Sequence, residues 1–205
     1  MTPCEKRGLL IVVSGPAGSG KGTVLGELLG DGAYCYSISA TTRAPRPGEV
    51  NGVNYHFLTR EEFEARIREG AMLEYTEYCG NYYGTPKKEA EAVLASGKNL
   101  LLEIEVEGAQ NVKKAYPEAV LIMLLPPSFA TQEARLRGRG TETEEKIRQR
   151  LLRTREEVPT VVNYDYVIYN RDGRSDEAVA DIRAIVRAES CAVSRNGDAA
   201  KKYFE

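Results

Sequence analysis

The sequence predicts an α/β fold in which helices cover both faces of a parallel sheet. Short apolar runs alternate with segments of helical apolar spacing, and a glycine-rich loop joins the first run to the first helix. Such alternation forms βαβ units, whose strands run parallel. Residues 40–97 interrupt it with a strand-and-helix pattern of their own. We therefore expect a core from residues 1–39 and 98–190, a small mixed α+β lobe inserted at 40–97, a helical segment at about 128–158 and a polar tail at 191–205.

Composition narrows the class of protein. A chain of 205 residues suffices for one domain with a full core, with or without a small inserted lobe. The 30 acidic and 28 basic residues nearly cancel, so neither a nucleic acid nor a membrane is an expected partner. We expect a cytoplasmic protein, because the N-terminus lacks a signal-peptide pattern and the apolar runs are too short to cross a bilayer. The widely spaced cysteines and the single histidine fit free thiols rather than a metal site: Cys4, Cys35, Cys79, Cys191 and His56.

The first apolar run, residues 8–14, leads into a loop suited to phosphate. Gly15 and Gly20, at the first and sixth positions of the loop, let successive backbone N–H groups converge on one anion, and the next helix adds its dipole. Lys21 adds a mobile positive charge. Gly22 stands where such loops carry Ser or Thr, so we expect magnesium to be held mostly through water and nucleotide oxygens. The expected phosphate contacts are Gly15, Pro16, Ala17, Gly18, Ser19, Gly20, Lys21, Gly22 and Thr23.

The other elements follow from apolar spacing and turn residues. Thr59 and Glu62 form a capping box that opens a helix, Thr85-Pro86 starts another, and Ser175 is expected to cap the last one. An aromatic hairpin is expected to turn at Gly80-Asn81. Further strands are expected at 34–39, 53–57, 72–83, 100–106, 119–125 and 164–170, and helices at 24–29, 60–69, 86–96, 108–116, 128–139, 141–158 and 175–189.

A second candidate anion site lies in residues 41–49. Arg43 and Arg46 are three residues apart in a loop that two prolines stiffen, so their guanidinium groups are presented at low entropic cost. Such a pair suits a second phosphate, and a solvated basic loop is the alternative. The phosphate is favoured because three tyrosines of the same lobe could donate hydroxyl groups to it: Tyr55, Tyr82 and Tyr83.

Together these motifs resemble those of guanylate kinases. The resemblance spans about residues 8–189 and rests on residues 15–23, 39–55, 80–85 and 138–145. Its most specific part is Ser-x-Thr-Thr-Arg-x-Pro-Arg-x-Gly-Glu-x-x-Gly-x-x-Tyr, from Ser39 to Tyr55. It implies a P-loop core, a GMP-binding lobe, an arginine-bearing lid, and ATP-dependent phosphorylation of GMP, and of dGMP, to GDP with Mg²⁺. ATP and GMP are then the expected partners, and the oligomeric state stays open.

The resemblance assigns residues to GMP. An ionised Glu74 would accept the N1–H and the 2-amino group of guanine, whereas adenine has an acceptor at N1 and lacks the 2-amino group. Thr85 would face the base too, although helix capping next to Pro86 also explains this residue, and both roles can coexist. The phosphate would contact Arg43, Arg46, Tyr55 and Tyr83, and the base would face Ser39, Glu74, Thr85 and Glu105.

The resemblance also implies the groups that stabilise the moving phosphoryl group. The lid arginines correspond to Arg135, Arg139 and Arg150, and with Lys21 and Arg43 they form the expected catalytic set. Asn170 resembles the residue that meets adenine. Glu103 and Glu105 stand where the family more often has aspartates, and Glu103 is assigned to the water shell of magnesium. Arg148, Arg153, Arg155 and Glu107 are expected to be solvated charges, Glu107 at the end of a strand.

Two other functions stay open at this stage. Guanylate-kinase-like domains also occur as inactive binding modules, although such a module would not need the complete phosphate loop. A kinase for another nucleoside monophosphate would differ in base preference. Neither kinase needs a general base, because the acceptor phosphate is largely dianionic at neutral pH, so His56 is expected to pack within its lobe.

Overall fold

A five-stranded parallel sheet forms the centre of the computed structural model, which describes residues 7–30, 32–138, 140 and 143–204. The strand order is β2-β7-β1-β8-β9, with Leu10 of β1 beside Leu100 of β7 and Ile11 beside Val120 of β8. This order confirms the expected parallel α/β core. The strands are β1 (Leu10–Ser14), β2 (Tyr34–Tyr36), β7 (Asn99–Glu103), β8 (Val120–Leu125) and β9 (Tyr166–Tyr169).

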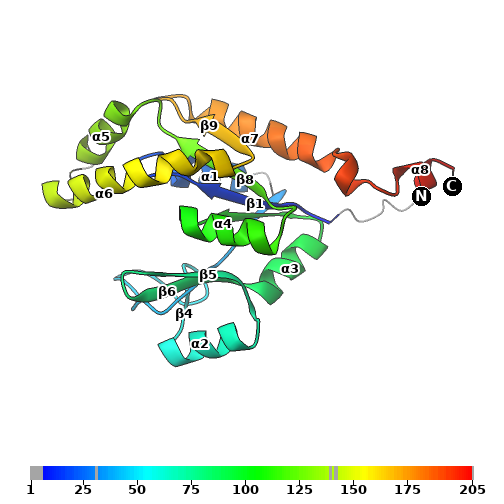
Figure 1. The fold of residues 1–205 in the computed structure, drawn as a ribbon, viewed down its shortest axis with the longest axis horizontal. Coiled ribbons are helices and arrows are strands. Elements are labelled where there is room, and N and C mark those ends of the chain that lie inside the picture. The colour runs from blue at the N-terminus through cyan, green and yellow to red at the C-terminus, as the bar shows by residue number, and fades with distance from the viewer. Residues whose placement is uncertain (1–6, 31, 139, 141–142, 205) are drawn as a thin grey trace.

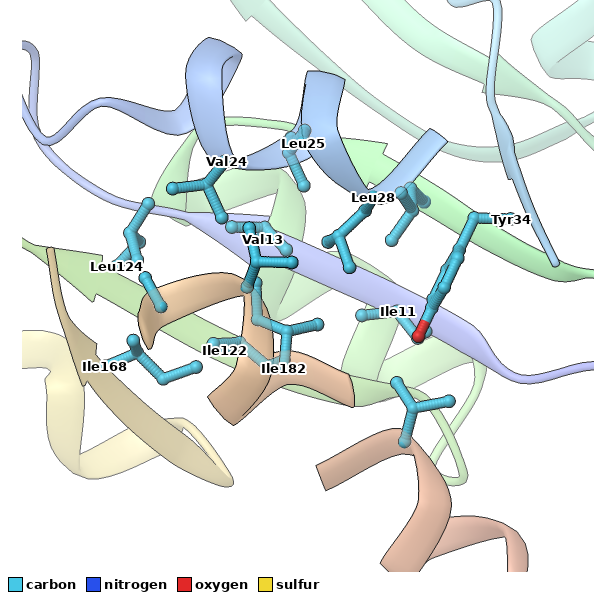
Figure 2. Packing of buried hydrophobic residues seen from close by; sticks show 14 of the residues in the cluster. Ile11, Val13, Val24, Leu25, Leu28, Tyr34, Ile122, Leu124, Ile168 and Ile182 are labelled. Carbon is cyan, nitrogen blue, oxygen red and sulfur yellow. The ribbon is translucent and has the colours of Figure 1, made fainter. Parts of the chain in front are cut away.

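Helices pack on both faces of this sheet (Figure 1). Successive residues of a strand point to opposite faces, so Ile11 and Val13 face one core while Leu10 and Val12 face the other. The first core packs against α1 (Lys21–Leu29) and α7 (Ser175–Ser190), as Figure 2 shows for Leu25 and Ile182, and the second against α3 (Lys87–Ala95) and α4 (Val106–Ala115). Burial on both faces explains why these strands read as continuous apolar runs.

Residues 40–86 form a separate, mixed sheet with the order β4-β3-β6-β5, which lies below the first sheet in Figure 1. Its strands are β3 (Ala40–Thr41), β4 (His56–Phe57), β5 (Met72–Tyr78) and β6 (Asn81–Pro86). The helix α2 (Arg60–Arg68) begins with the expected Thr59–Glu62 capping box. Its Phe63 is fully buried and stacks on Tyr82, with ring centroids 5.2 Å apart.

Several boundaries differ from the sequence prediction. The hairpin turns at Cys79-Gly80, one residue earlier than expected, with φ of 50° and 75° at these two residues. The second strand stops at Tyr36, and Val53 lies in a turn with 66% of its surface exposed rather than in a strand. Glu105 is the N-cap of α4 rather than a strand residue. Alternation of apolar and polar residues therefore overestimated strand length at sheet edges and strand ends.

Two further helices lie beside the phosphate loop. They are α5 (Phe129–Gly138) and α6 (Glu144–Glu157), and the short 3₁₀ helix η1 (Val158–Asn163) follows α6. The apolar side chains of Leu136, Ile147 and Leu151 pack together and against Ala17 of the loop. This contact places the expected lid segment next to the loop.

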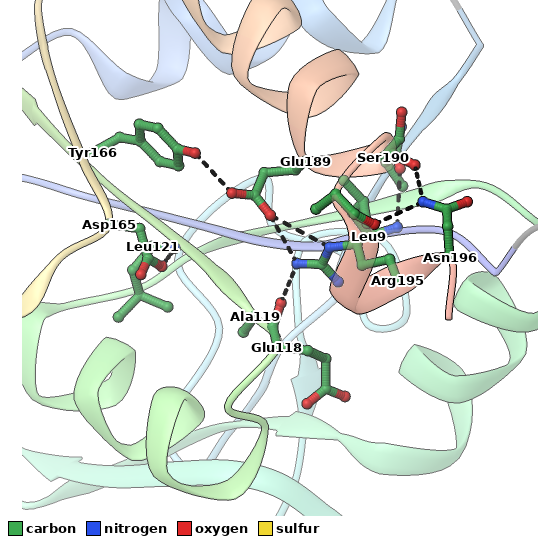
Figure 3. Close-up of polar contacts among 12 residues, drawn as sticks. Leu9, Glu118, Ala119, Leu121, Asp165, Tyr166, Glu189, Ser190, Arg195 and Asn196 are labelled. Carbon is green, nitrogen blue, oxygen red and sulfur yellow. Dashed lines mark hydrogen bonds and ion pairs between the residues drawn. The ribbon is translucent and has the colours of Figure 1, made fainter. Parts of the chain in front are cut away.

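The polar C-terminal segment, for which the sequence predicted no element, forms two short helices. It contains η2 (Val193–Arg195) and α8 (Ala199–Phe204). Arg195 donates to the carbonyl of Glu118 and to the carboxylate of Glu189, which also accepts from Tyr166 (Figure 3). Ser175 is not a cap, since it is the first residue of α7 and its hydroxyl bonds Glu27. Among the residues described, no helix is both long and apolar enough to cross a membrane.

Candidate functional site

The phosphate loop between β1 and α1 requires its glycines. Gly20 precedes α1 with φ of 87°, in the left-handed region that favours glycine. A Cβ on Gly15 would lie 2.1 Å from the carbonyl oxygen of Leu124, and one on Gly20 would lie 2.3 Å from Nδ2 of Asn170. The Lys21 ammonium donates to the carbonyl of Gly15 at 2.6 Å, so its charge lies over the start of the loop.

Three side chains brace the carbonyl groups of this loop. Gln132 donates to Ala17 at 2.8 Å, Asn170 donates to Ser19 at 2.8 Å, and Arg135 donates to Gly18 at 3.2 Å. Because these three hydrogen bonds hold the carbonyl groups in place, the loop adopts this conformation without a bound ligand. A cavity of about 370 Å³ opens beside them and is lined by residues that include Gly18, Gly20, Thr23, Arg135 and Asn170.

A larger cavity, of about 850 Å³, lies between the phosphate loop, the second sheet, the end of β7 and α6. It brings together Lys21 of the loop and Arg46 of the second candidate anion site, which are far apart in the sequence. The predicted site residues that line it are Gly15, Ala17, Lys21, Ser39, Arg46, Tyr55, Glu74, Tyr83, Glu103, Glu105 and Arg150.

Arg43 lies behind the surface of the large cavity. Its Nη2 donates to both oxygens of Glu49, at 2.9 and 3.0 Å, and its guanidinium lies 5.6 Å from the ring centre of Tyr55. Glu49 also accepts from the backbone N–H of Arg46 at 2.7 Å, the bond that does most to lower the pKa of this carboxyl group. Glu49 thus links the Arg43 side chain to the backbone of Arg46, and of these two arginines only Arg46 lines the cavity.

Glu74 is a buried carboxyl group at the cavity, with 6% of its surface exposed. Burial raises its pKa to about 7, although hydrogen bonds from Thr85 oppose the shift. The Thr85 hydroxyl donates to Oε1 of Glu74 at 2.9 Å. The capping alternative for Thr85 is wrong, because Thr85 belongs to β6 and α3 begins without a side-chain cap after Pro86.

Two carboxylates at the end of β7 face different partners. Glu103 accepts from the hydroxyl of Tyr36 at 3.0 Å. Glu105 pairs with Arg153 of α6 at 3.1 Å, so the expectation that Arg153 is solvated is wrong: it lines the large cavity. Arg148 and Glu107 are exposed, as expected, although Glu107 lies in the first turn of α4 and not in a strand.

The sequence reasoning missed several side chains that line the large cavity. On α6 a pattern was available, because Lys146, Gln149, Arg153 and Glu157 succeed one another at the three- and four-residue spacing of one helix face, on which Arg150 also lies. Tyr36, Thr76 and Tyr78 come from strand positions that no motif marks.

The remaining predicted residues that the structure describes line neither cavity. Tyr82 lies away from both, packed on Phe63. Pro16, Ser19 and Thr85 are buried behind the lining, and Gly22 is exposed. Arg139 falls outside the described residues.

The side chains around the loop fit a magnesium ion that is held chiefly by water and by the oxygens of a bound phosphate group. Within the described part of the chain, no three His, Cys, Asp or Glu side chains group as metal ligands. Glu103 lines the cavity that holds Lys21 and could accept hydrogen bonds from metal-bound water. Residue 22 offers no hydroxyl, since it is glycine.

The fold and the site define a class of protein: an α/β protein whose glycine-rich loop shares a cavity with the second candidate anion site, on a small mixed sheet. Comparison with known proteins agrees, and the guanylate kinase family model matches residues 7–189. The chain therefore belongs to the guanylate kinase family.

Individual relatives match almost the whole chain. The guanylate kinase of Shouchella clausii is 51% identical over 98% of this chain and 96% of its own length, and that of Halalkalibacterium halodurans is 53% identical over 91% of each chain. The crystal structure of guanylate kinase from Anaplasma phagocytophilum superposes with a TM-score of 0.74 at 34% identity, over 93% of this chain and 90% of that one.

Proposed function

We propose that this protein transfers the terminal phosphoryl group of ATP to GMP, and to dGMP, giving ADP together with GDP or dGDP. The observation that carries the proposal is the shared cavity, because Lys21 and Arg46 both line it. Two phosphates bound by these groups would face each other without an intervening protein nucleophile. Direct transfer between them requires positioning and positive charge rather than covalent catalysis.

The proposal gives each charged group a role. Lys21 and the loop N–H groups bind the ATP phosphates, and Arg46, Tyr55 and Tyr83 bind the GMP phosphate, with Arg43 next to them. Arg135 and Arg150 lie at the smaller and the larger cavity, and they add positive charge around the phosphoryl group with Lys21, Arg43 and Arg139. We assign residues 40–97 to GMP binding, residues 128–158 to a lid and Asn170 to the adenine side.

Glu74 supplies the base preference. An ionised carboxylate facing the cavity accepts two adjacent N–H groups, which guanine presents and adenine does not. The Thr85 hydroxyl donates to Oε1 of Glu74. Gly108 leaves room beside Oε2, since a Cβ on residue 108 would lie 3.2 Å from this oxygen. Ser39 and Glu105 line the same cavity and complete the base site.

Magnesium bound to ATP would neutralise phosphate charge and orient the terminal phosphate. Glu103 would contact its water shell, and Gly22 leaves the ion to water and ATP oxygens. The three described cysteines, Cys35, Cys79 and Cys191, are free thiols, which supports a reaction in the cytoplasm.

A substrate competition tests the proposal. Purified protein with ATP and Mg²⁺ should convert GMP and dGMP to their diphosphates at least roughly a hundredfold faster than AMP or UMP. Glu74→Gln should reduce the preference for GMP over AMP by at least about tenfold, whereas Glu77→Gln, an exposed position on the same strand, should leave it unchanged. Absence of turnover with GMP would end the proposal, and an unchanged preference in Glu74→Gln would refute the base assignment.

A further inference from the structure

Arg153 contacts three separate parts of the molecule at the large cavity. Its Nη2 lies 3.1 Å from Glu105, the N-cap of α4, and its guanidinium lies 4.5 Å from the ring centre of Tyr78, the last residue of β5. Its Nε donates to Glu157 of its own helix at 2.5 Å. One side chain of α6, in the expected lid, therefore connects the start of α4 in the core with the second sheet.

The contact with Tyr78 has the geometry of a cation–π interaction. A guanidinium within about 6 Å of a ring centre is attracted to the ring face, most strongly where water is partly excluded. Arg153 is 35% exposed in its side chain, so the contact is partly shielded. Tyr78 lies next to the Cys79-Gly80 turn, so Arg153 contacts the end of the hairpin.

Arg153 also balances two carboxylates. Glu157 is only 12% exposed in its side chain, and both Glu157 and Glu105 line the cavity. Without Arg153 these negative charges would face a cavity that, under the proposed function, receives two phosphorylated nucleotides. Electrostatic repulsion would then weaken nucleotide binding.

We infer that Arg153 is a positioning residue that fixes the β5–β6 hairpin to α6 and orients Glu105 toward bound GMP. This inference rests on the proposed function and adds to it a residue that acts through Tyr78 and Glu105 rather than on the reacting atoms. It predicts an effect on the binding of GMP and little effect on the transfer step.

Steady-state kinetics separate these effects. Arg153→Leu should raise the KM for GMP roughly five- to twentyfold and change kcat less than about twofold, since a cation–π contact and a partly exposed ion pair are lost. Arg153→Lys, which keeps the charge, should recover part of the loss. Arg148→Leu is the matched control, because Arg148 lies on the same helix with 76% of its side chain exposed, and its KM should be unchanged.

A double-mutant cycle tests the contact without relying on turnover. Tyr78→Leu and Arg153→Leu should shift the thermal unfolding midpoint less in combination than the sum of the single shifts, whereas Tyr78→Phe, which retains a ring, should preserve the coupling to Arg153. Additive shifts, or a KM for GMP equal to that of Arg148→Leu, would overturn the inference. Lack of GMP turnover by the unmodified protein would instead refute the proposed function. The double-mutant cycle would still measure the coupling between Tyr78 and Arg153, because it depends only on unfolding midpoints.

Discussion

A single buried carboxyl group, Glu74, links the stability of the protein to the proposed preference for guanine. The side chain is buried by β6 and α4, and the hydroxyl of Thr85 donates to it. Such a group is costly to ionise in the free protein, which is why its pKa rises to about 7. Guanine, by donating two N–H groups, would favour the ionised form.

The raised pKa predicts a pH dependence of stability. The folded protein binds the Glu74 proton more tightly than the unfolded chain, whose carboxyl pKa is 4.5, so this stabilisation is present below pH 4.5 and is lost as the pH rises through about 7. Between pH 5 and pH 8 the free energy of unfolding should fall by about 2 kcal/mol more in the wild type than in Glu74→Gln. Urea titrations of both proteins at the two pH values measure the difference, and parallel pH profiles would contradict the burial argument.

The Thr85 hydroxyl should control the charge of Glu74. Thr85→Val removes a hydrogen bond that lowers the pKa of Glu74, so the KM for GMP should rise roughly tenfold at pH 7 and by less at pH 8.5, where the carboxylate is ionised in any case. Thr85→Ser keeps the hydroxyl and should behave like the wild type. A KM that rises equally at both pH values would show that Thr85 acts through packing alone.

At the scale of the elements, the β5–β6 hairpin carries a local strain. Cys79 has φ of 50°, a left-handed conformation that most side chains adopt only at a cost, and Gly80 follows with φ of 75°. Two successive residues with positive φ form the hairpin turn for which Asn-Gly is favoured. The chain places Cys at the first of these positions.

Cys79→Asn should therefore stabilise the protein by about 0.5 to 1 kcal/mol in urea unfolding. Cys79→Ala removes the thiol without favouring the left-handed conformation, and it should give no such gain. If Asn and Ala had equal effects, the strain at this turn would not be a measurable part of the stability.

The elements also show which features the sequence can predict. The apolar runs at 8–14 and 119–125 contain the observed strands β1 and β8, and the capping box at Thr59 begins α2, because local spacing and hydrogen bonding determine these features. The role of Thr85 could not be predicted in this way, since its partner Glu74 lies on the neighbouring strand. The same holds for Arg153, whose partners Tyr78 and Glu105 are distant in the sequence.

At the scale of the whole molecule, the fold brings the two candidate anion sites to one cavity. The phosphate loop lies at the end of β1 in the first sheet, and the arginine loop belongs to the second sheet. Motif spacing predicted each site separately. Their shared cavity depends on how the second sheet and α6 pack against the core, which the motifs alone do not encode.

Label transfer from ATP tests this arrangement most directly. With ATP labelled in its terminal phosphate, Mg²⁺ and GMP, the label should appear in GDP at the rate of ADP formation, with none on the protein and little in inorganic phosphate. Lys21→Ala should abolish the transfer while the protein stays folded. Label that accumulated on the protein, or that passed to water at the same rate with and without GMP, would contradict direct transfer between two nucleotides in one cavity.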